Sequence, residues 1–290
     1  MQTIPELRPR HPEIRPDYTI AQHWESYTPE EHGVWRALYE HQAQVLPGRA
    51  CQEFLDGLSR LKLTADAIPD FERLSDDLEK LTGWRVVAVP SLVPDDVFFD
   101  HLANRRFPAG QFIRKPMQLD YIEEPDIFHD VFGHVPMLAH PVFADYMEAY
   151  GKGGQRALTQ FGALKNLARL YWYTVEFGLI EKPEGLRIYG SGIVSSRAES
   201  IHAVESASPN RIHFNLERVM RTGYRIDDFQ ESYFVISSFE ELFAETYKDF
   251  APLYQRLETG PTHAPGDVLA GDDVHHRGTH SYLSGSHAAG

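Results

Sequence analysis

The stretch EPDIFHDVFGHVP, residues 124–136, is the part of the sequence that most constrains the fold and the chemistry. It carries two histidines, His129 and His134, five positions apart, after a proline suited to the first turn of a helix. Residues five apart lie about 140° apart on an ideal α-helix, a poor arrangement for binding one metal ion. Gly133 and the proline that follows His134 would allow the helix to distort or end here and bring the imidazoles together. By itself the pair is more typical of surface or core histidines than of a metal site.

A second stretch, YWYTVEFGLI at residues 171–180, places one carboxylate, Glu176, in an otherwise apolar helix. A buried, unpaired carboxylate costs several kcal/mol, so it needs a cation, a donor or a proton. Glu176 either pairs with an arginine such as Arg169, reaches solvent, or ligates a metal ion. Two imidazoles and one carboxylate form the facial triad of non-haem Fe(II) oxygenases, which leaves coordination positions open. The same set also holds catalytic zinc in hydrolases, and the spacing alone does not choose between the metals.

Hydrophobic periodicity predicts mostly helices with a few short strands, and favours a single mostly α domain over a doubly wound sheet. Residues 163–180 are apolar almost all the way round, so we expect one long buried helix there. A helix over 141–150 is expected to end before the sequence GKGG at 151–154, and strands at 186–189 and 192–194 to form a small hairpin. The other expected helices cover about 29–46, 54–61, 69–81, 95–105, 216 onward and 238–254, and the other expected strands 85–90, 211–215 and 224–236.

The two ends of the chain differ in composition from its middle. Residues 1–29 carry five prolines and little periodicity, so we expect an extended arm, followed by one domain over 30–258. Residues 259–290 are rich in Gly, His, Ser, Pro and Asp and hold five of the 15 histidines. We expect this tail to be disordered, with adventitious metal binding by its histidines as the alternative.

The charge balance excludes two classes of partner. The chain has 42 acidic and 28 basic residues and a formal net charge of −14, which repels phosphate backbones and anionic lipid. We therefore expect neither a nucleic-acid partner nor a membrane partner. The one cysteine, Cys51, cannot form an intrachain disulfide, and the N-terminal residues lack the apolar core of a signal peptide. Both observations favour a cytoplasmic protein.

Three motifs in order, PDIFHDVFGHVP, YWYTVEFGL and YGSGIVSS, resemble the pterin-dependent aromatic amino acid hydroxylases. Within that family the chain is most similar to the bacterial enzymes that act on phenylalanine. The resemblance runs in order from about residue 85 to 255, extends back to about residue 15, and covers the catalytic domain only. It implies that residues 30–258 form an iron- and pterin-binding domain. It implies that His129, His134 and Glu176 ligate Fe(II), and that the second cofactor is tetrahydrobiopterin or a related bacterial tetrahydropterin.

The resemblance also implies roles for individual side chains. Arg114 matches an arginine that pairs with the substrate carboxylate, a task suited to a bidentate guanidinium, and Ser195 matches a residue at the same end of the substrate. The other matching substrate positions are Tyr121, Ile122, Pro125, Phe128, Trp172 and Val235. The matching pterin positions are Ser91, Leu92, Val93, Phe98, Asp130, Ala168 and Tyr171. Two positions depart from the animal enzymes, since Asp130 replaces a glutamate and Pro108 replaces a histidine near the pterin.

Two of these positions favour phenylalanine as the substrate. Trp172 is typical of the phenylalanine and tyrosine enzymes, and Val235 stands where tyrosine hydroxylases carry an acidic residue. An apolar residue suits a ring without a hydroxyl, because a site built to bind a hydroxyl penalises its absence. The implied reaction converts L-phenylalanine to L-tyrosine with O2, and we expect a monomer because no segment resembles the animal tetramerisation helix. The alternatives are a tyrosine or tryptophan hydroxylase, a zinc hydrolase with the same triad, and a non-enzymatic amino-acid sensor.

Overall fold

The computed structural model describes residues 14–119 and 124–282. The chain forms two compact units, the first comprising Met1–His41 and Gln52–Gln160 and the second Gln42–Cys51 and Phe161–Gly290. Helices predominate among the described residues, and the strands are short, which confirms the mostly α class. Tyr121 and Ile122 of the expected substrate loop lie outside the described residues, as do 1–13 of the expected arm and 283–290 of the expected tail.

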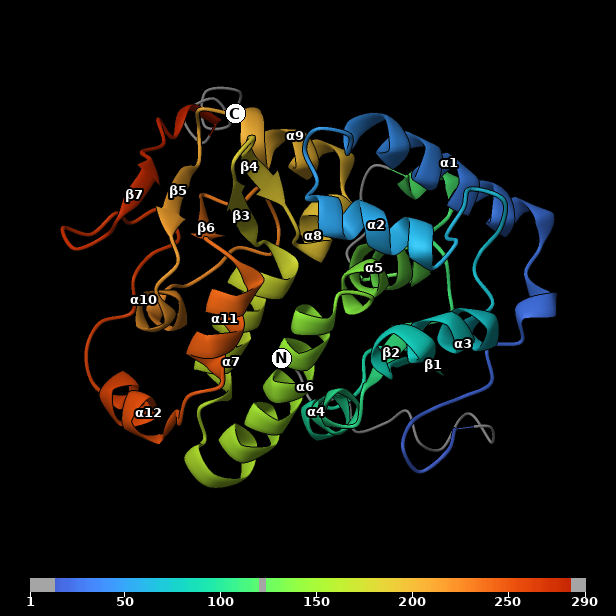
Figure 1. Ribbon diagram of the computed structural model, residues 1–290, viewed down its shortest axis with the longest axis horizontal. Helices are drawn as coiled ribbons and strands as arrows, with labels where there is room; N and C mark the ends of the chain where they lie inside the picture. The colour runs from blue at the N-terminus through green and yellow to red at the C-terminus, as the bar shows by residue number, and fades with distance from the viewer. Residues whose placement is uncertain (1–13, 120–123, 283–290) are drawn as a thin grey trace. The chain divides into compact units, whose positions relative to one another are not determined.

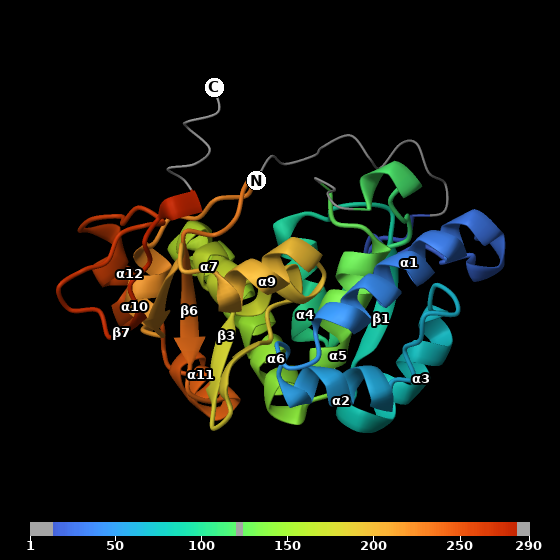
Figure 2. The ribbon, with the colours of Figure 1, turned by 90° about the horizontal axis from the view of Figure 1, so that it is seen from above.

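The first unit is built around a parallel pair of strands. β1 (Arg85–Val89) and β2 (Arg106–Gly110) are joined by α4 (Asp95–Ala103). α3 (Phe71–Thr82) packs on β1 (Figure 2), and α4 packs on β2. The sequence predicts β1 and α3, including the cap at Gly83, whose positive φ of 77° suits glycine. It does not predict β2. The other helices that begin in this unit are α1 (Pro29–Val45), α2 (Gln52–Arg60), the π-helix Phe128–His134, α5 (Val135–Leu138), α6 (Pro141–Arg156), the short π-helical turn Ala157–Phe161, and the short 3-10 turns Trp24–Ser26 and Pro116–Gln118.

α6 is longer than the sequence predicts, because its glycines serve packing and do not end the helix. The helix continues through 151–154 to Arg156. A Cβ on Gly151 would overlap the backbone of α4, and one on Gly154 would overlap the ring of Phe99. The glycines therefore allow α4 and α6 to approach closely, a contact that a local pattern does not reveal.

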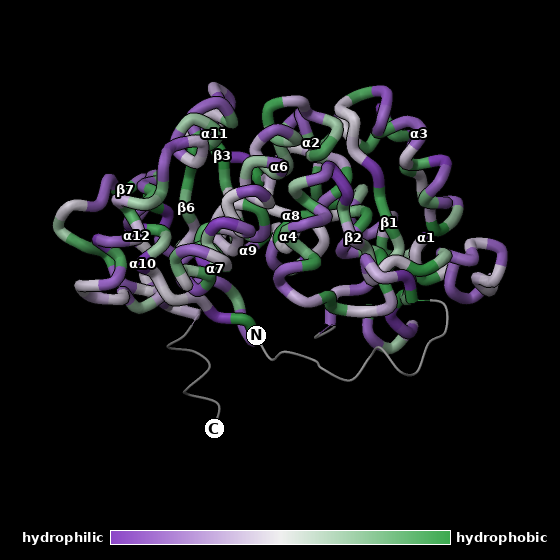
Figure 3. The backbone as a smooth tube through the Cα atoms, turned by 90° about the horizontal axis from the view of Figure 1, so that it is seen from below, coloured by the Kyte–Doolittle hydropathy of each residue, from purple (hydrophilic) through white to green (hydrophobic). Residues whose placement is uncertain are grey.

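The second unit contains a five-stranded sheet in the order β4-β3-β6-β5-β7 (Figure 1). The inner pairs β3–β6 and β6–β5 are parallel, and the edge strands β4 and β7 are antiparallel to their neighbours. β6 is buried along its whole length, and hydrophobic colour runs along part of it in Figure 3. The strands are β3 (Leu179–Lys182), β4 (Gly185–Ile188), β5 (Asn210–His213), β6 (Ser232–Ile236) and β7 (Val274–His276). The helices are α7 (Leu164–Tyr171), the π-helical turn Trp172–Glu176, α8 (Ser191–Val194), α9 (Arg197–Glu205), α10 (Leu216–Arg221), α11 (Phe239–Thr246) and α12 (Ala251–Glu258).

Three expectations for this unit are wrong. The long helix expected over 163–180 ends at Glu176, and Leu179 and Ile180 belong to strand β3. The hairpin consequently consists of β3 and β4, while Gly192–Val194 lies in α8. Residues 163–180 are apolar both in the helical part and in the start of β3, because both are buried. Hydrophobic periodicity cannot separate a buried helix from a buried strand. The helix expected over 238–254 is divided into α11 and α12.

The expectation of a disordered tail is also wrong for residues 259–282. β7 pairs with β5, and the backbone N–H of Gly278 donates to Asn210 Oδ1 at 2.9 Å. Asp272 forms an ion pair with Arg218 in which both side chains are at least nine-tenths buried, with Nε and Oδ1 2.9 Å apart. Backbone pairing and a buried ion pair attach this segment without requiring a hydrophobic composition. Its polar composition therefore did not indicate its structure.

Candidate metal centre and substrate site

His129 and His134 lie on a π-helix, Phe128–His134, and not on an α-helix. A π-helical turn is closed by an i→i+5 hydrogen bond, so residues five apart fall on nearly the same side. The two Nε2 atoms are 3.3 Å apart, and His134 is buried. A metal ion about 2.1 Å from each nitrogen would then form an N–metal–N angle of about 104°. The helix distortion that the sequence requires for a shared metal ion is present.

The segment before the π-helix is fixed by a buried ion pair. Arg114 donates from Nε and Nη2 to the two carboxylate oxygens of Asp126, at 2.8 and 2.9 Å. Asp126 also accepts from the backbone N–H of His129 at 3.1 Å, and so positions the start of the π-helix. Burial alone would raise the pKa of Asp126, but the hydrogen bonds and charge of Arg114 hold that pKa below its usual value.

Aromatic packing holds the π-helix from the other side. The ring of Phe128 stacks on Phe132 with centroids 4.6 Å apart, and Trp35 meets Phe128 edge-on at 5.3 Å. The guanidinium carbon of Arg114 lies 5.9 Å from the Phe128 centroid. Phe128 is fully buried, so it serves the core as well as any role beside the metal. Pro125 is half-buried at the start of this segment.

Glu176 ends the π-helical turn Trp172–Glu176, which is followed by a 2.8 Å hydrogen bond from Phe177 N to Trp172 O. Its carboxylate oxygen Oε2 accepts from Ser191 Oγ at 2.9 Å. A Cβ on Gly190 would overlap the carbonyl oxygen of Glu176, so this glycine lets the chain pass close to the end of the turn. Arg169, the arginine considered as its partner, donates to the carbonyl of Met220 at 3.1 Å.

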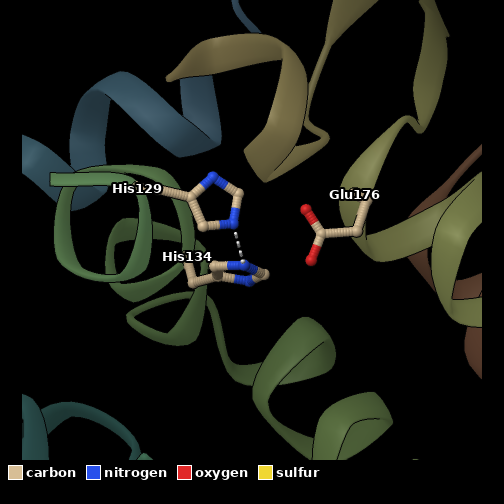
Figure 4. Close-up of side chains that lie close together, drawn as sticks. All are labelled: His129, His134 and Glu176. Carbon is tan, nitrogen blue, oxygen red and sulfur yellow. Dashed lines mark hydrogen bonds between the residues drawn. The ribbon is translucent and has the colours of Figure 1, made fainter. Parts of the chain in front are cut away.

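The three expected ligands lie close together. His129, His134 and Glu176 each offer one ligand atom, and these atoms lie within 4.8 Å of one another (Figure 4). In Figure 4 the carboxylate points toward the two imidazoles. The donor set of two neutral nitrogens and one carboxylate suits a divalent transition metal.

Among the expected substrate residues, Trp172 has the most closely defined orientation. Its indole stacks on Tyr224 at 4.4 Å with a 15° angle between the planes, and its Nε1 donates to Gln230 Oε1 at 2.9 Å. Ser195 donates from Oγ to the carbonyl of Ser191 at 2.7 Å. Val235 is buried on β6 and is aligned with residues of β3 and β5.

The expected pterin residues of the first unit gather at the carboxyl ends of β1 and β2. Ser91, Leu92 and Val93 follow β1, whose last residue is paired with Gly110 at the end of β2. The N–H of Gly110 donates to Asp130 Oδ2 at 2.8 Å, so the π-helix meets the same edge. Phe98 lies on α4 with its centroid 5.8 Å from Phe99, and Ala168 and Tyr171 lie on α7 with half-buried side chains.

Sequence reasoning did not single out three residues that hold the expected site residues in place: Asp126, Ser191 and Gln230. The role of such a supporting residue becomes visible only when its partner, which is distant in the sequence, is known. For Asp126 that partner is Arg114, 12 positions away. Gln230 is 58 positions from Trp172, so no local pattern connects them.

Comparisons with known proteins identify the family of the chain. A sequence profile described as biopterin-dependent aromatic amino acid hydroxylase matches residues 11–258. The chain belongs to this family, and it is an aromatic amino acid hydroxylase catalytic domain that depends on biopterin. The resemblance inferred from the motifs is thereby confirmed.

Individual relatives cover nearly the whole chain. Phenylalanine-4-hydroxylase of Caulobacter vibrioides is 64% identical over 94% of this chain and 92% of its own length, and that of Ralstonia nicotianae is 61% identical over 92% and 85%. The Chromobacterium violaceum phenylalanine hydroxylase with bound oxidised Fe(III) superposes with a TM-score of 0.87 at 58% identity, covering 89% of this chain and 94% of that chain. Its iron- and phenylalanine-bound structure gives 0.86 at 57% identity, with the same coverage.

A membrane-spanning helix was not found in the described part of the chain, where every helix is too short or too polar to cross a bilayer.

Proposed function

We propose that the chain is a phenylalanine 4-monooxygenase, which converts L-phenylalanine to L-tyrosine with O2, a tetrahydropterin and non-haem Fe(II). The observation that carries this proposal is the grouping of His129, His134 and Glu176 in a member of the hydroxylase family. Relatives named phenylalanine-4-hydroxylase at 61–64% identity support the substrate, and the iron-bound structure of the Chromobacterium violaceum enzyme supports the metal.

His129, His134 and Glu176 would hold the iron, and a set of three protein ligands would leave room for other reactants to bind it. Iron, reduced and supplied with a tetrahydropterin, provides the activation of O2 that no side chain can provide. The protein binds and orients the two organic reactants and excludes water. Ser191 donates to the Glu176 carboxylate at 2.9 Å, and Asp126 fixes the start of the π-helix, so the ligands are preorganised.

Arg114 binds the substrate carboxylate in this proposal. Its Nε and Nη2 are directed at Asp126, so the guanidinium is oriented before the substrate arrives, and its Nη1 and Nη2 edge is the one suited to a second carboxylate. Ser195 supports the same end of the amino acid. The other substrate residues are proposed to be Tyr121, Ile122, Pro125, Phe128, Trp172 and Val235.

The ring of the substrate is distinguished by apolar contacts. Val235 is fully buried and offers no hydrogen-bond partner to a phenol hydroxyl, which favours phenylalanine over tyrosine. Trp172 presents a ring that Gln230 and Tyr224 hold in one orientation. For the pterin we propose Ser91, Leu92, Val93, Phe98, Asp130, Ala168 and Tyr171.

Three further expectations belong to this proposal: a monomer, a location in the cytoplasm, and a catalytic domain with boundaries at 30 and 258. The absence of a disulfide-forming cysteine pair supports the second. The family match over residues 11–258 supports the third, although it begins earlier than residue 30.

The test is anaerobic reconstitution with Fe(II), followed by iron analysis and product analysis with Phe, Tyr and Trp offered together. We expect pterin-dependent tyrosine formation from phenylalanine. His129→Ala, His134→Ala and Glu176→Gln should each lose iron and turnover, while His41→Ala and Glu258→Gln serve as matched controls. Normal iron content and turnover in all three ligand variants would refute the metal assignment. Zinc content without pterin dependence would instead indicate a hydrolase.

A further inference from the structure

A second group of metal-binding side chains lies in the sheet of the second unit. Glu181, His213 and His275 each offer one ligand atom, and these atoms lie within 4.8 Å of one another. Glu181 belongs to β3, His213 ends β5, and His275 is the middle residue of β7. None of them has a part in the proposed hydroxylase site.

The sheet register brings Glu181 and His213 to the same face. Leu179, Val235 and His213 are aligned across the parallel strands β3, β6 and β5. Residues two apart on a strand share a face, so Glu181 shares the face of Leu179 and hence of His213. β6 ends at Ile236, before it reaches the level of Glu181. The group therefore lies at the carboxyl ends of the parallel strands.

A β-bulge directs His275 to the same place. Ile212 pairs with Val274 and Arg211 with His276, so His275 is an extra residue on β7 with no counterpart on β5. Bulges of this kind redirect a side chain and are frequent beside functional sites. The rings of His275 and His213 are 5.7 Å apart at an angle of 78°, and His275 Nδ1 lies 3.9 Å from Glu181 Oε1.

The chemistry of the group fits a borderline divalent metal ion. Imidazole ligands suit zinc, copper and nickel, and a carboxylate completes three ligands of a tetrahedral site. In such a site the donor atoms lie about 2.1 Å from zinc and about 3.4 Å from one another. The three side chains must therefore move by about 1 Å to bind the ion. Glu181 and His275 have side chains 49% and 31% exposed, which leaves them room to rotate. The net charge of −14 further favours a cation.

We propose that Glu181, His213 and His275 form a peripheral site for a divalent transition metal ion, with zinc as the preferred occupant. The ion joins two strands of the hydroxylase sheet, β3 and β5, to β7, which comes from the segment after residue 258. The remaining coordination position is taken by water. The site links the C-terminal segment to the domain and takes no part in hydroxylation.

The test measures the metal content of the iron-loaded holoenzyme. Zinc is added by equilibrium dialysis, and zinc and iron per chain are measured together. We expect one zinc per chain to bind with no loss of iron. His213→Ala and His275→Ala should each weaken zinc binding at least about 100-fold, since loss of even an outer partner of a ligand costs 10- to 100-fold. Glu181→Gln should weaken it as well.

His276→Ala is the matched control, because this neighbouring histidine of β7 lies by the carbonyl of Ala207 at 3.3 Å and outside the group. It should bind zinc like the unaltered chain. Zinc should also slow amide hydrogen exchange in β7 in the unaltered chain and in His276→Ala, but not in His275→Ala. The proposal is overturned if zinc displaces iron, if a variant that combines Glu181→Gln, His213→Ala and His275→Ala binds zinc as well as the unaltered chain, or if His276→Ala weakens binding as much as His275→Ala.

Discussion

Glu199 lies in the interior of the second unit and gives the stability of the protein a specific pH dependence. It belongs to α9 and is only 6% exposed. Its Oε1 accepts from the hydroxyl of Tyr233 and, at 3.4 Å, from the N–H of Gln230. Burial raises the pKa of Glu199 from its ordinary value of 4.5 to about 7, and the negative charge of Asp228 adds to the rise.

The sign of the effect follows from the direction of the shift. A carboxyl whose pKa is raised by folding stabilises the folded state at pH values below 4.5, and this contribution is lost as the pH rises through about 7. Between about pH 5.5 and about pH 8, the contribution of Glu199 to the free energy of unfolding falls by about 2 kcal/mol. The unaltered chain should lose this amount of unfolding free energy relative to a variant that stays neutral.

Glu199→Gln is that variant, because its amide oxygen can still accept from Tyr233 while carrying no charge. The assay is denaturant unfolding of the iron-free chain, so that metal binding does not add its own pH dependence. The unfolding free energy of Glu199→Gln minus that of the unaltered chain should rise by about 2 kcal/mol between about pH 5.5 and about pH 8. His202 on the same helix, whose pKa burial lowers to about 4, titrates in both proteins and cancels in the difference.

Glu258→Gln, at the exposed end of α12, is the control and should show a difference that does not change with pH. A constant difference for Glu199→Gln as well would refute the reasoning.

Three further substitutions test the supports of the expected site. Gln230→Leu removes the acceptor of Trp172 Nε1, at a cost of about 1–3 kcal/mol, and should raise KM for phenylalanine more than it lowers kcat, measured by steady-state kinetics. Asp126→Asn leaves Arg114 without its carboxylate and should lower the unfolding free energy by about 3 kcal/mol and raise KM; unchanged values of both would contradict the buried pair. Gly57→Ala places a Cβ against a backbone carbonyl of α5 and should cost about 1–3 kcal/mol in denaturant unfolding, whereas Gly33→Ala, with open space around it, should not destabilise.

The parts of the fold that the sequence predicts correctly are those with local signals. α3 begins at an aspartate cap, with Asp70 accepting from Glu72 N at 3.0 Å, and ends at a glycine with positive φ. α11 begins at Ser238, whose hydroxyl accepts from Glu241 N, as the capping pattern predicts. In each case the residues that decide the boundary lie within four positions of one another.

The errors occur where a distant segment decides the structure. Gly151 looks like the end of a helix, and only the backbone of α4 beside it shows why the helix continues. Residues 259–282 look disordered by composition, and only pairing with β5, more than 60 positions earlier, holds β7 in the sheet. No property of the tail itself contains that information, because an edge strand is bound through its backbone groups.

The histidine spacing is the opposite case, in which a conflict with the regular helix was itself informative. Five positions are wrong for a shared metal on an α-helix, so the sequence predicts either no site or a distorted helix. The structure has the distortion: a π-helix carries His129 and His134, and a second π-helical turn ends at Glu176. π-Helical turns are rare and tend to occur at functional sites. Of the three π-helical turns in the described residues, the two that bear expected ligands fit selection for the proposed metal site, whereas Ala157–Phe161 bears none of these ligands.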